Sequence, residues 1–370
     1  MADEADGVAV KQEEKLALST SRGFPQWLAS TGGSLAFTTY QAGKLFLIGL
    51  RPDGHISVFE RTFPRCMGLG VSADGRSLAL ATRNQIQRFD NVLPEGQADK
   101  SGFDAVFAPH AAWVTGDLDV HDVGFGADGR PAFVNTLFGC LATVSDGYSF
   151  RPLWKPPFIS RLAAEDRCHL NGLAMQDGAP AYVTAVSRSD MITGWRDRRH
   201  EGGVLIDVRD DRIVTDQLSM PHSPRATADG IYLLDSGRGQ IARVDPKSGA
   251  KTDIAFCPGF LRGLAIHNGY AIATVSLPRD GAFSGLALQD ELKKRDGEPW
   301  CGVCIVDLRS GDLVEWIRLN GAIKELFDVA VIPEVRCPMA LGVHSPDIQS
   351  LISFDPEYGV LAAPAPAPQA

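Results

Sequence analysis

One short pattern recurs along most of this chain: an apolar run, a turn of the Asp-Gly, Asn-Gly or Gly-Gly kind, and a second apolar run. Two such runs joined by a tight turn are typical of a β-hairpin. Neighbouring copies lie about 50 residues apart on average. Seven copies are recognised, and they begin at Trp27, Gly68, Asp122, Asn171, Ser223, Arg262 and Asp328.

Most copies are followed by a third apolar strand and a fourth, more polar one, as in residues 202–208 and 212–218. Four antiparallel strands per repeat of this length indicate a β-propeller blade. We therefore predict an all-β propeller, with seven blades as the first expectation and six as the alternative. The unit at Asp328 is degenerate and lacks an outer strand, which an N-terminal strand near residues 15–21 could supply, closing the ring.

The chain has 370 residues, a length that ordinarily suggests two or three domains. A blade cannot bury its sheet alone, so the repeats predict one propeller domain over 16–357, with disordered segments at 1–15 and 358–370. Two units carry insertions, at 187–203 and 277–300, the second containing a short helix near 285–295. We expect both insertions at one rim of the ring as lids; the alternative is that they are solvated loops.

Composition excludes several classes of partner. The formal net charge is −9, which argues against binding to nucleic acid or to an anionic membrane surface. No apolar stretch is long enough to span a membrane, and the acidic N-terminus does not resemble a secretory signal. Seven scattered cysteines favour reduced thiols over a disulfide framework. The sequence therefore predicts a cytoplasmic protein.

The first strand of a propeller blade is innermost, so the starts of the repeats are expected to line one mouth of the central channel. Three histidines lie at these starts in three consecutive units: His121, His169 and His222. Converging imidazoles suit a divalent metal, with zinc, iron or manganese favoured over calcium. Asn171 and Asp122 are predicted to add oxygen ligands or to orient the histidines.

Further charged residues near the same positions are candidates for catalysis. Arg225 and Arg262 are predicted to hold a carboxylate or an oxyanion, because a guanidinium binds these groups with two hydrogen bonds. Asp328 is a candidate general base, or else a partner of Arg262 across the ring. The alternative for the whole set is that these polar groups bind only water and neighbouring blades.

Several segments between about residues 22 and 345 carry a family resemblance, among them HDVGFGADGRPAFVNTLFGCL, CHLNGLAM, MPHSPR, GFLRGLAI and CGVCIVDLRSGDLVEWIRL. They resemble an uncharacterised bacterial family of unknown function with a predicted propeller fold. The resemblance implies the fold and supplies no activity.

A more distant resemblance concerns NGLAMQDGAPAYVTAV, which is similar to the senescence marker protein and gluconolactonase group. That resemblance implies a divalent metal held at the channel by Glu, Asn, Asn and Asp, and Asn171 matches one of the asparagines. The other ligand positions fall on His121 and His222, with Trp27 or its neighbours at the acidic one. Imidazoles in place of hard oxygen ligands point away from calcium. The three histidines also look like those of peptidyl-hydroxyglycine lyase propellers, which hold zinc at the axis.

These observations lead to one functional prediction with two alternatives. The prediction is a metal-assisted enzyme of hydrolase, lyase or isomerase type, acting on a small polar or peptide substrate at the channel mouth. The first alternative is a non-catalytic propeller that binds a protein partner. The second is a calcium-dependent hydrolase similar to the sugar lactonases.

Overall fold

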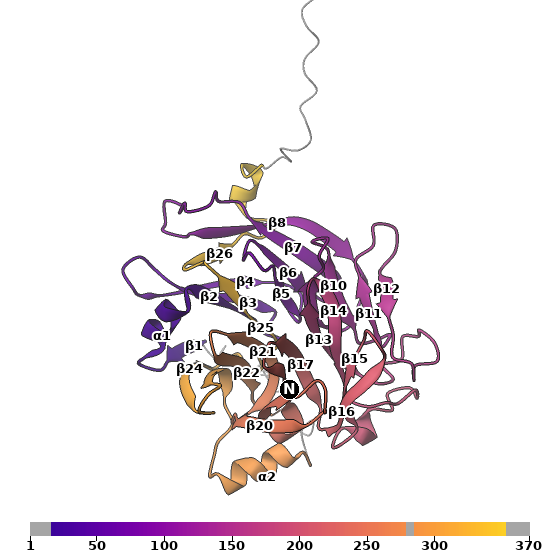
Figure 1. Cartoon of the computed structure of the whole chain (residues 1–370). Coiled ribbons are helices and arrows are strands. Elements are labelled where there is room, and N and C mark those ends of the chain that lie inside the picture. Colours follow the sequence, from indigo (N-terminus) through magenta and orange to yellow (C-terminus); the bar gives the residue numbers. More distant parts are fainter. Residues whose placement is uncertain (1–15, 279–284, 353–370) are drawn as a thin grey trace, which may run out of the picture.

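The computed structural model describes residues 16–278 and 285–352, and these residues form six sheets. The sheets are arranged in a ring around a common axis (Figure 1). The expected segments 1–15 and 358–370 lie outside the described residues. The sheets are named blades I to VI, each given from its inner to its outer strand. Blade I contains β25 (Val329–Pro333), β2 (Gly33–Thr38), β3 (Lys44–Leu50) and β4 (Ile56–Thr62). Blade II contains β5 (Leu69–Val71), β6 (Ser77–Ala81), β7 (Gln85–Asn91), β8 (Ala105–Val114) and β26 (Pro338–Ala340).

The next three blades follow the chain without interruption. Blade III contains β9 (Val120–Phe125), β10 (Pro131–Asn135), β11 (Cys140–Thr143) and β12 (Arg151–Trp154). Blade IV contains β13 (Leu170–Gln176), β14 (Ala179–Ala185), β15 (Gly203–Asp207) and β16 (Arg212–Leu218). Blade V contains β17 (Pro221–Thr227), β18 (Gly230–Asp235), β19 (Gln240–Val244) and β20 (Lys251–Phe256).

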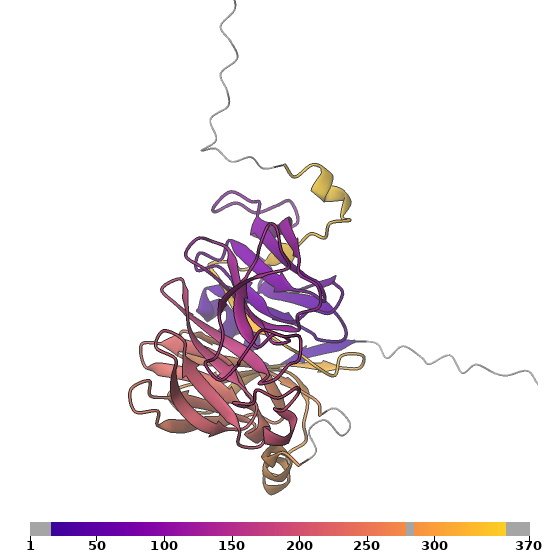
Figure 2. The same ribbon diagram turned by 90° about the vertical axis from the view of Figure 1, so that its right-hand side faces the viewer.

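Blade VI takes its outermost strand from the N-terminal part of the chain. It contains β21 (Phe260–His267), β22 (Tyr270–Ser276), β23 (Cys301–Asp307), β24 (Leu313–Asn320) and β1 (Ala17–Thr20). The helices are short, and they are α1 (Phe24–Thr31), α2 (Ala287–Lys294), η1 (Arg196–Arg198), η2 (Ser236–Arg238) and η3 (Pro346–Gln349). The helix expected near 285–295 is α2. Figure 2 shows α2 at the end of the molecule opposite η3.

The ring has six blades, so the first expectation of seven was wrong. β25 pairs with β2 from Gly33↔Pro333 to Phe37↔Val329, which makes the first and last repeats two parts of blade I. Trp27 lies in α1 and not in an inner strand. The pair Gly32–Gly33 was misread as a hairpin turn: Gly32, with φ 72°, ends α1 in the left-handed region, and β2 begins at Gly33.

The N-terminal strand also has a different place from the one expected. β1 pairs with β24, from Ala17↔Asn320 to Thr20↔Ile317, and therefore extends blade VI instead of completing the last repeat. β26 lies parallel to β8 and covers the outer edge of blade II in the same way. Two outer edges are thus partly covered by segments from the two ends of the described chain.

Apolar side chains fill the spaces between blades, and hydroxyl groups join neighbouring blades close to the channel. Thr38 donates to the carbonyl of Met67, Thr136 to that of Leu170, and Thr274 to that of Phe327, at 2.6, 2.6 and 2.9 Å. Each bond runs from the second strand of one blade, or the residue just after it, to the inner-strand region of the next blade. These bonds fix the starts of the inner strands, where the candidate site lies.

Among the described residues, no helix is long and apolar enough to cross a membrane. All seven cysteines are buried free thiols.

Candidate functional site

The three predicted histidines come from blades III, IV and V, each at the start of an inner strand. The His121 and His169 rings meet edge to face with centroids 4.9 Å apart. His121 and His222 are less than 10% exposed. We call this end of the channel the histidine mouth and define it by His121, His169, His222, Arg262 and Glu325.

Hydrogen bonds fix the protonation pattern of these imidazoles. Nδ1 of His121 lies 2.8 Å from the carbonyl oxygen of Asp119, and Nδ1 of His222 lies 2.9 Å from that of Met220. A carbonyl oxygen can only accept, so Nδ1 carries the hydrogen in both rings. Nε2 is then left with a free lone pair, which is the arrangement found in metal-binding and proton-accepting histidines.

Burial keeps two of these rings neutral. It lowers the pKa of His121 to about 4, and the nearby His169 and Arg262 charges act in the same direction, partly opposed by Asp119. Burial, reinforced by the Arg262 charge, also holds the pKa of His222 well below its ordinary value. At neutral pH both side chains therefore offer a lone pair instead of a positive charge.

His169 is paired with an acidic residue that the sequence analysis missed. Its Nδ1 lies 3.0 Å from Oδ2 of Asp166, and Nε1 of Trp195 donates to the same oxygen at 2.7 Å. Burial is the largest single influence and acts to raise the pKa of Asp166, but His169, the Trp195 hydrogen bond and His121 together outweigh it, and the pKa lies below its ordinary value. The sequence could have indicated this pair through the spacing of three residues between Asp166 and His169. It could not show that both residues adopt the left-handed backbone conformation that brings their side chains together.

A lid covers this pair. Trp195, in the first insertion, stacks on His169 with ring centroids 4.2 Å apart. Trp195 also packs on an apolar cluster that includes Phe260, Met220 and Leu288 of α2. The two insertions therefore meet at the histidine mouth, as expected of lids.

Arg262 completes the ring of polar groups, but its partner differs from the one considered. Nη2 of Arg262 lies 2.9 Å from Oε1 of Glu325, and both side chains are nearly buried. The guanidinium also lies 5.0 Å from the centre of the Phe327 ring and 5.4 Å from that of Phe260. Phe327 in turn contacts His121, and Phe260 contacts His222, so these rings connect Arg262 to the histidines. Glu325 lies in a connection between strands, where no repeat pattern singled it out.

Backbone strain is concentrated at the same place. Thirteen described residues other than glycine have a positive φ, and five of them lie within three positions of the three histidines. The five are Asp119, Asp166, His169, Met220 and Ser223. Such conformations cost about 1–3 kcal/mol each and gather at functional sites.

The predicted metal ligands divide between the histidine mouth and a deeper part of the channel. The free Nε2 atoms suit a borderline metal, but in the part of the chain that the structure describes no three His, Cys, Asp or Glu side chains form a metal-binding group. Asn171 is buried and its Oδ1 accepts from Thr184 at 2.8 Å. Its Nδ2 is buried without a hydrogen-bond partner. Asp122 lies deeper in the channel than the three histidines, where it pairs with Arg225.

Asp122, Arg225 and Asp328 form a second cluster, which we call the central plug. They come from blades III, V and I. Arg225 Nη1 lies 2.9 Å from Asp122 Oδ2, and its Nη2 lies 3.6 Å from Asp328 Oδ1. Further plug bonds reach the backbone of the other three blades, through Leu69 N, Leu173 N and O, and Leu264 O. Charged side chains from three alternate blades thus occupy the channel axis, and hydrogen bonds hold them to the backbone of the other three blades.

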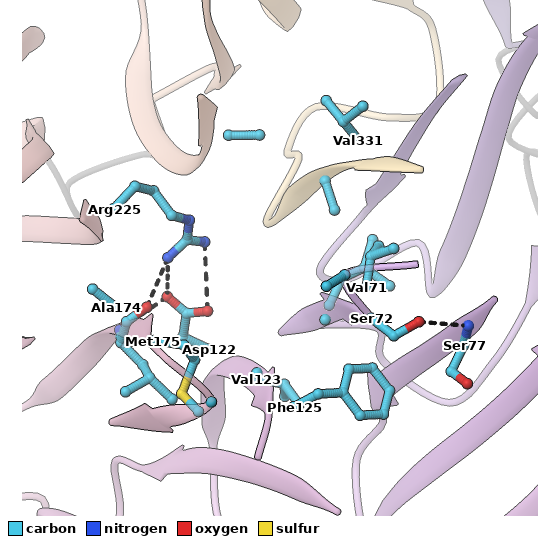
Figure 3. Close-up of a pocket in the computed structure, with 18 of the residues that line it drawn as sticks. Val71, Ser72, Ser77, Asp122, Val123, Phe125, Ala174, Met175, Arg225 and Val331 are labelled. Atoms are coloured by element: carbon cyan, nitrogen blue, oxygen red, sulfur yellow. Dashed lines mark hydrogen bonds and ion pairs between the residues drawn. The ribbon is translucent and has the colours of Figure 1, made fainter. Parts of the chain in front are cut away.

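A cavity of about 1000 Å³ lies beyond the plug, at the end where the inner strands turn into their neighbours (Figure 3). Asp122 and Arg225 line its inner end, while Asp74 and Asp177 belong to its outer rim. The predicted catalytic residues therefore divide: Arg262 lies at the histidine mouth, whereas Arg225 and Asp328 belong to the plug. Repeat spacing brought both groups to the channel but could not show that they lie at different depths.

Asp328 gives the protein an expected pH dependence of stability. Burial and the Asp122 charge raise its pKa to about 7, against the opposing effect of Arg225. A carboxyl whose pKa rises on folding favours the folded state at low pH, and that contribution disappears as pH rises toward 7. We expect wild type to gain stability relative to Asp328→Asn as pH falls from 7 to 5, with a slope that approaches but does not exceed about 1.4 kcal/mol per pH unit. Urea unfolding at pH 5, 6 and 7 measures this, and a difference independent of pH would contradict it.

Comparison with known proteins agrees with this architecture. A family sequence model described as Domain of unknown function (DUF4915) matches residues 22–341. No curated protein matches the chain. Among solved structures, a chain of the nidogen/laminin complex is similar with a TM-score of 0.52 and 11% identity, covering 81% of this chain and 98% of that one. Virginiamycin B lyase from Staphylococcus aureus aligns with a TM-score of 0.40 and 13% identity, covering 83% and 99%. The likeness to the nidogen/laminin chain concerns the fold alone.

Proposed function

We infer that this chain, which belongs to the family described as Domain of unknown function (DUF4915), is an acid–base enzyme of hydrolase, lyase or isomerase type acting on a small polar substrate. The observation that carries the proposal is the Asp166–His169 pair at the histidine mouth. Asp166 holds the Nδ1 hydrogen of His169, so Nε2 is directed to accept a proton from substrate or water. The ionised carboxylate then stabilises the imidazolium that forms.

The surrounding groups suit a substrate that is negatively charged or becomes so. Arg262 supplies a fixed positive charge at the same mouth, where it pairs with Glu325. The neutral imidazole of His121, in contact with His169, offers a second polar contact without competing for the proton. Trp195 covers the pair and limits access of water, which strengthens these interactions.

The test is a panel of substrate classes with matched histidine variants. The panel contains simple esters and lactones for hydrolysis, β-substituted carboxylates for elimination, and α-chiral hydroxy and amino acids for epimerisation. We expect turnover of one class, and a loss of at least about 100-fold in kcat/KM in His169→Ala. Asp166→Asn should also lower kcat and shift the pH profile of the reaction, because the carboxylate orients the imidazole.

The control is His110→Ala, which breaks a His–Asp pair far from the channel: Nδ1 of His110 lies 2.8 Å from Asp90 on the outer strands of blade II. This variant should keep full activity. Turnover that survives His169→Ala would overturn the proposal. Absence of turnover over the whole panel, together with stable co-purification of another protein, would favour the interaction propeller instead.

A second candidate adds a divalent metal to the same site, with zinc, iron or manganese preferred to calcium. The Nδ1 atoms of His121, His169 and His222 are all hydrogen-bonded, which leaves each Nε2 available to a metal. The three rings must move closer together than they are here to bind one ion. The measurement is metal content of protein purified without an affinity tag. Less than about a tenth of an equivalent of any transition metal, unchanged in His169→Ala, would exclude the metal. Thermal stabilisation by calcium in preference to zinc would instead support the lactonase-like alternative.

A further inference from the structure

The cavity on the other side of the plug is separate from the histidine mouth. Its walls come from all six blades and are mostly apolar, with Val71, Val123, Phe125, Met175 and Val331 among them (Figure 3). At about 1000 Å³ it lies at the upper end of the size range of small-molecule sites. Its inner end presents one ion pair, Asp122 with Arg225. The proposed function at the histidine mouth uses none of these residues.

The exposed member of that ion pair is the cation. The Arg225 side chain is 22% exposed, whereas those of Asp122 and Asp328 are 3% and 2% exposed. Nε and Nη1 of Arg225 are fully engaged with Leu264 O, Leu173 O, Pro224 O and Asp122 Oδ2, at 2.7–2.9 Å. Among the described residues, Nη2 has two long contacts, 3.5 Å to Asp122 Oδ1 and 3.6 Å to Asp328 Oδ1. Its two hydrogens are thus the least satisfied donors in the plug.

We propose that this cavity is a binding site for a small amphiphilic carboxylate, whose charged end bonds to Nη2 of Arg225 and whose apolar body packs against the inner-strand walls. A carboxylate oxygen matches a guanidinium donor better than a neutral group does, because charge-assisted hydrogen bonds are about twice as strong. The apolar walls then contribute through the burial of hydrocarbon.

The added negative charge is accommodated by the plug itself. Asp328 faces Asp122 of β9, Arg225 of β17 and the backbone N–H of Leu69 in β5. Because Asp122 already compensates Arg225, an arriving anion favours the protonated form of Asp328, whose pKa is about 7. Binding of a carboxylate should therefore take up a proton and weaken as pH rises from 6 to 8. An ammonium ligand would show the opposite sign.

Three six-carbon probes with different end groups test the site on the full chain: hexanoate, hexan-1-ol and hexylamine, titrated by saturation-transfer NMR or calorimetry. We expect hexanoate to bind at least about tenfold more tightly than the other two. Arg225→Gln should lower hexanoate affinity by about tenfold and leave hexanol unchanged. The affinity for hexanoate should fall between pH 6 and 8.

A second variant keeps the test decisive if Arg225→Gln fails to fold. Thr227 lines the outer part of the cavity at the end of β17. Its hydroxyl accepts from Asp229 N, a role that aspartate can keep, and donates to Gly230 O at 3.0 Å, a bond that aspartate loses. Thr227→Asp should weaken hexanoate binding, whereas Thr252→Asp, the same change on the exposed outer strand β20, should not. Tighter binding of hexylamine, or hexanoate binding that neither Arg225→Gln nor Thr227→Asp weakens, would overturn the proposal.

Discussion

Asp122→Ala is expected to lower the free energy of unfolding by about 3–5 kcal/mol, because it leaves the largely buried Arg225 without its closest counter-charge. Asp122 also accepts from Leu173 N of the next blade at 3.0 Å, so the substitution removes an inter-blade bond as well. Urea unfolding at pH 7 provides the measurement.

Two controls separate charge from packing. Asp146→Ala breaks a surface pair with Arg130, where Asp146 is 77% exposed, and should cost at most about 1 kcal/mol. The double variant Asp122→Ala with Arg225→Met removes both charges and should recover part of the lost stability. If the double variant loses as much stability as Asp122→Ala and Arg225→Met do together, an unpaired buried charge is not the cause of the loss in Asp122→Ala.

Gly263→Ala is the second substitution with a large expected effect. A Cβ at Gly263 would lie 2.6 Å from both the Cα of Asp328 and the backbone N of Val329, where real Cβ atoms are not found. The clash is between backbone segments of blades VI and I, so no side chain can move to relieve it. We expect a loss of about 3 kcal/mol in the free energy of unfolding.

Gly147 supplies the matched control. It lies in an exposed loop, and a Cβ there would meet nothing within 4 Å. Gly147→Ala should therefore leave stability within about 0.5 kcal/mol of wild type. Equal unfolding midpoints for the two alanine variants would show that the backbones of blades VI and I can move apart at Gly263 without loss of stability.

Local patterns predicted the blades well because each hairpin carries its own turn signal. The Asp-Gly turn after β9 and the Asn-Gly turn after β21 both occur as expected. The count of blades depends instead on a pairing between residues about 300 positions apart, β2 with β25. No local signal records such a pairing, and two partial repeats at the ends of the chain were therefore counted as two blades.

The candidate site was predictable to the extent that it follows the repeats. His121, His169 and His222 occupy equivalent positions in consecutive blades, and the structure brings them to the same mouth. Asp166 and Glu325 lie in irregular connections, where positive φ values and tertiary packing decide the direction of a side chain. The depth of Arg225 and Asp328 follows from the alternation of faces along a strand, which a one-residue error in strand start reverses.

Strand β25, which closes the ring by pairing with β2, has a consequence for the timing of folding. Glu325, Phe327, Asp328 and β25 all belong to one late segment of the chain. During synthesis from the N-terminus, blades III to V and strands β5 to β8 of blade II can form while β2 still presents an open edge toward the axis. Both the arginine partner at the histidine mouth and one acid of the plug arrive only with that segment. A nascent or truncated chain lacking it therefore cannot complete either the histidine mouth or the central plug, so ring closure and site formation are a single event.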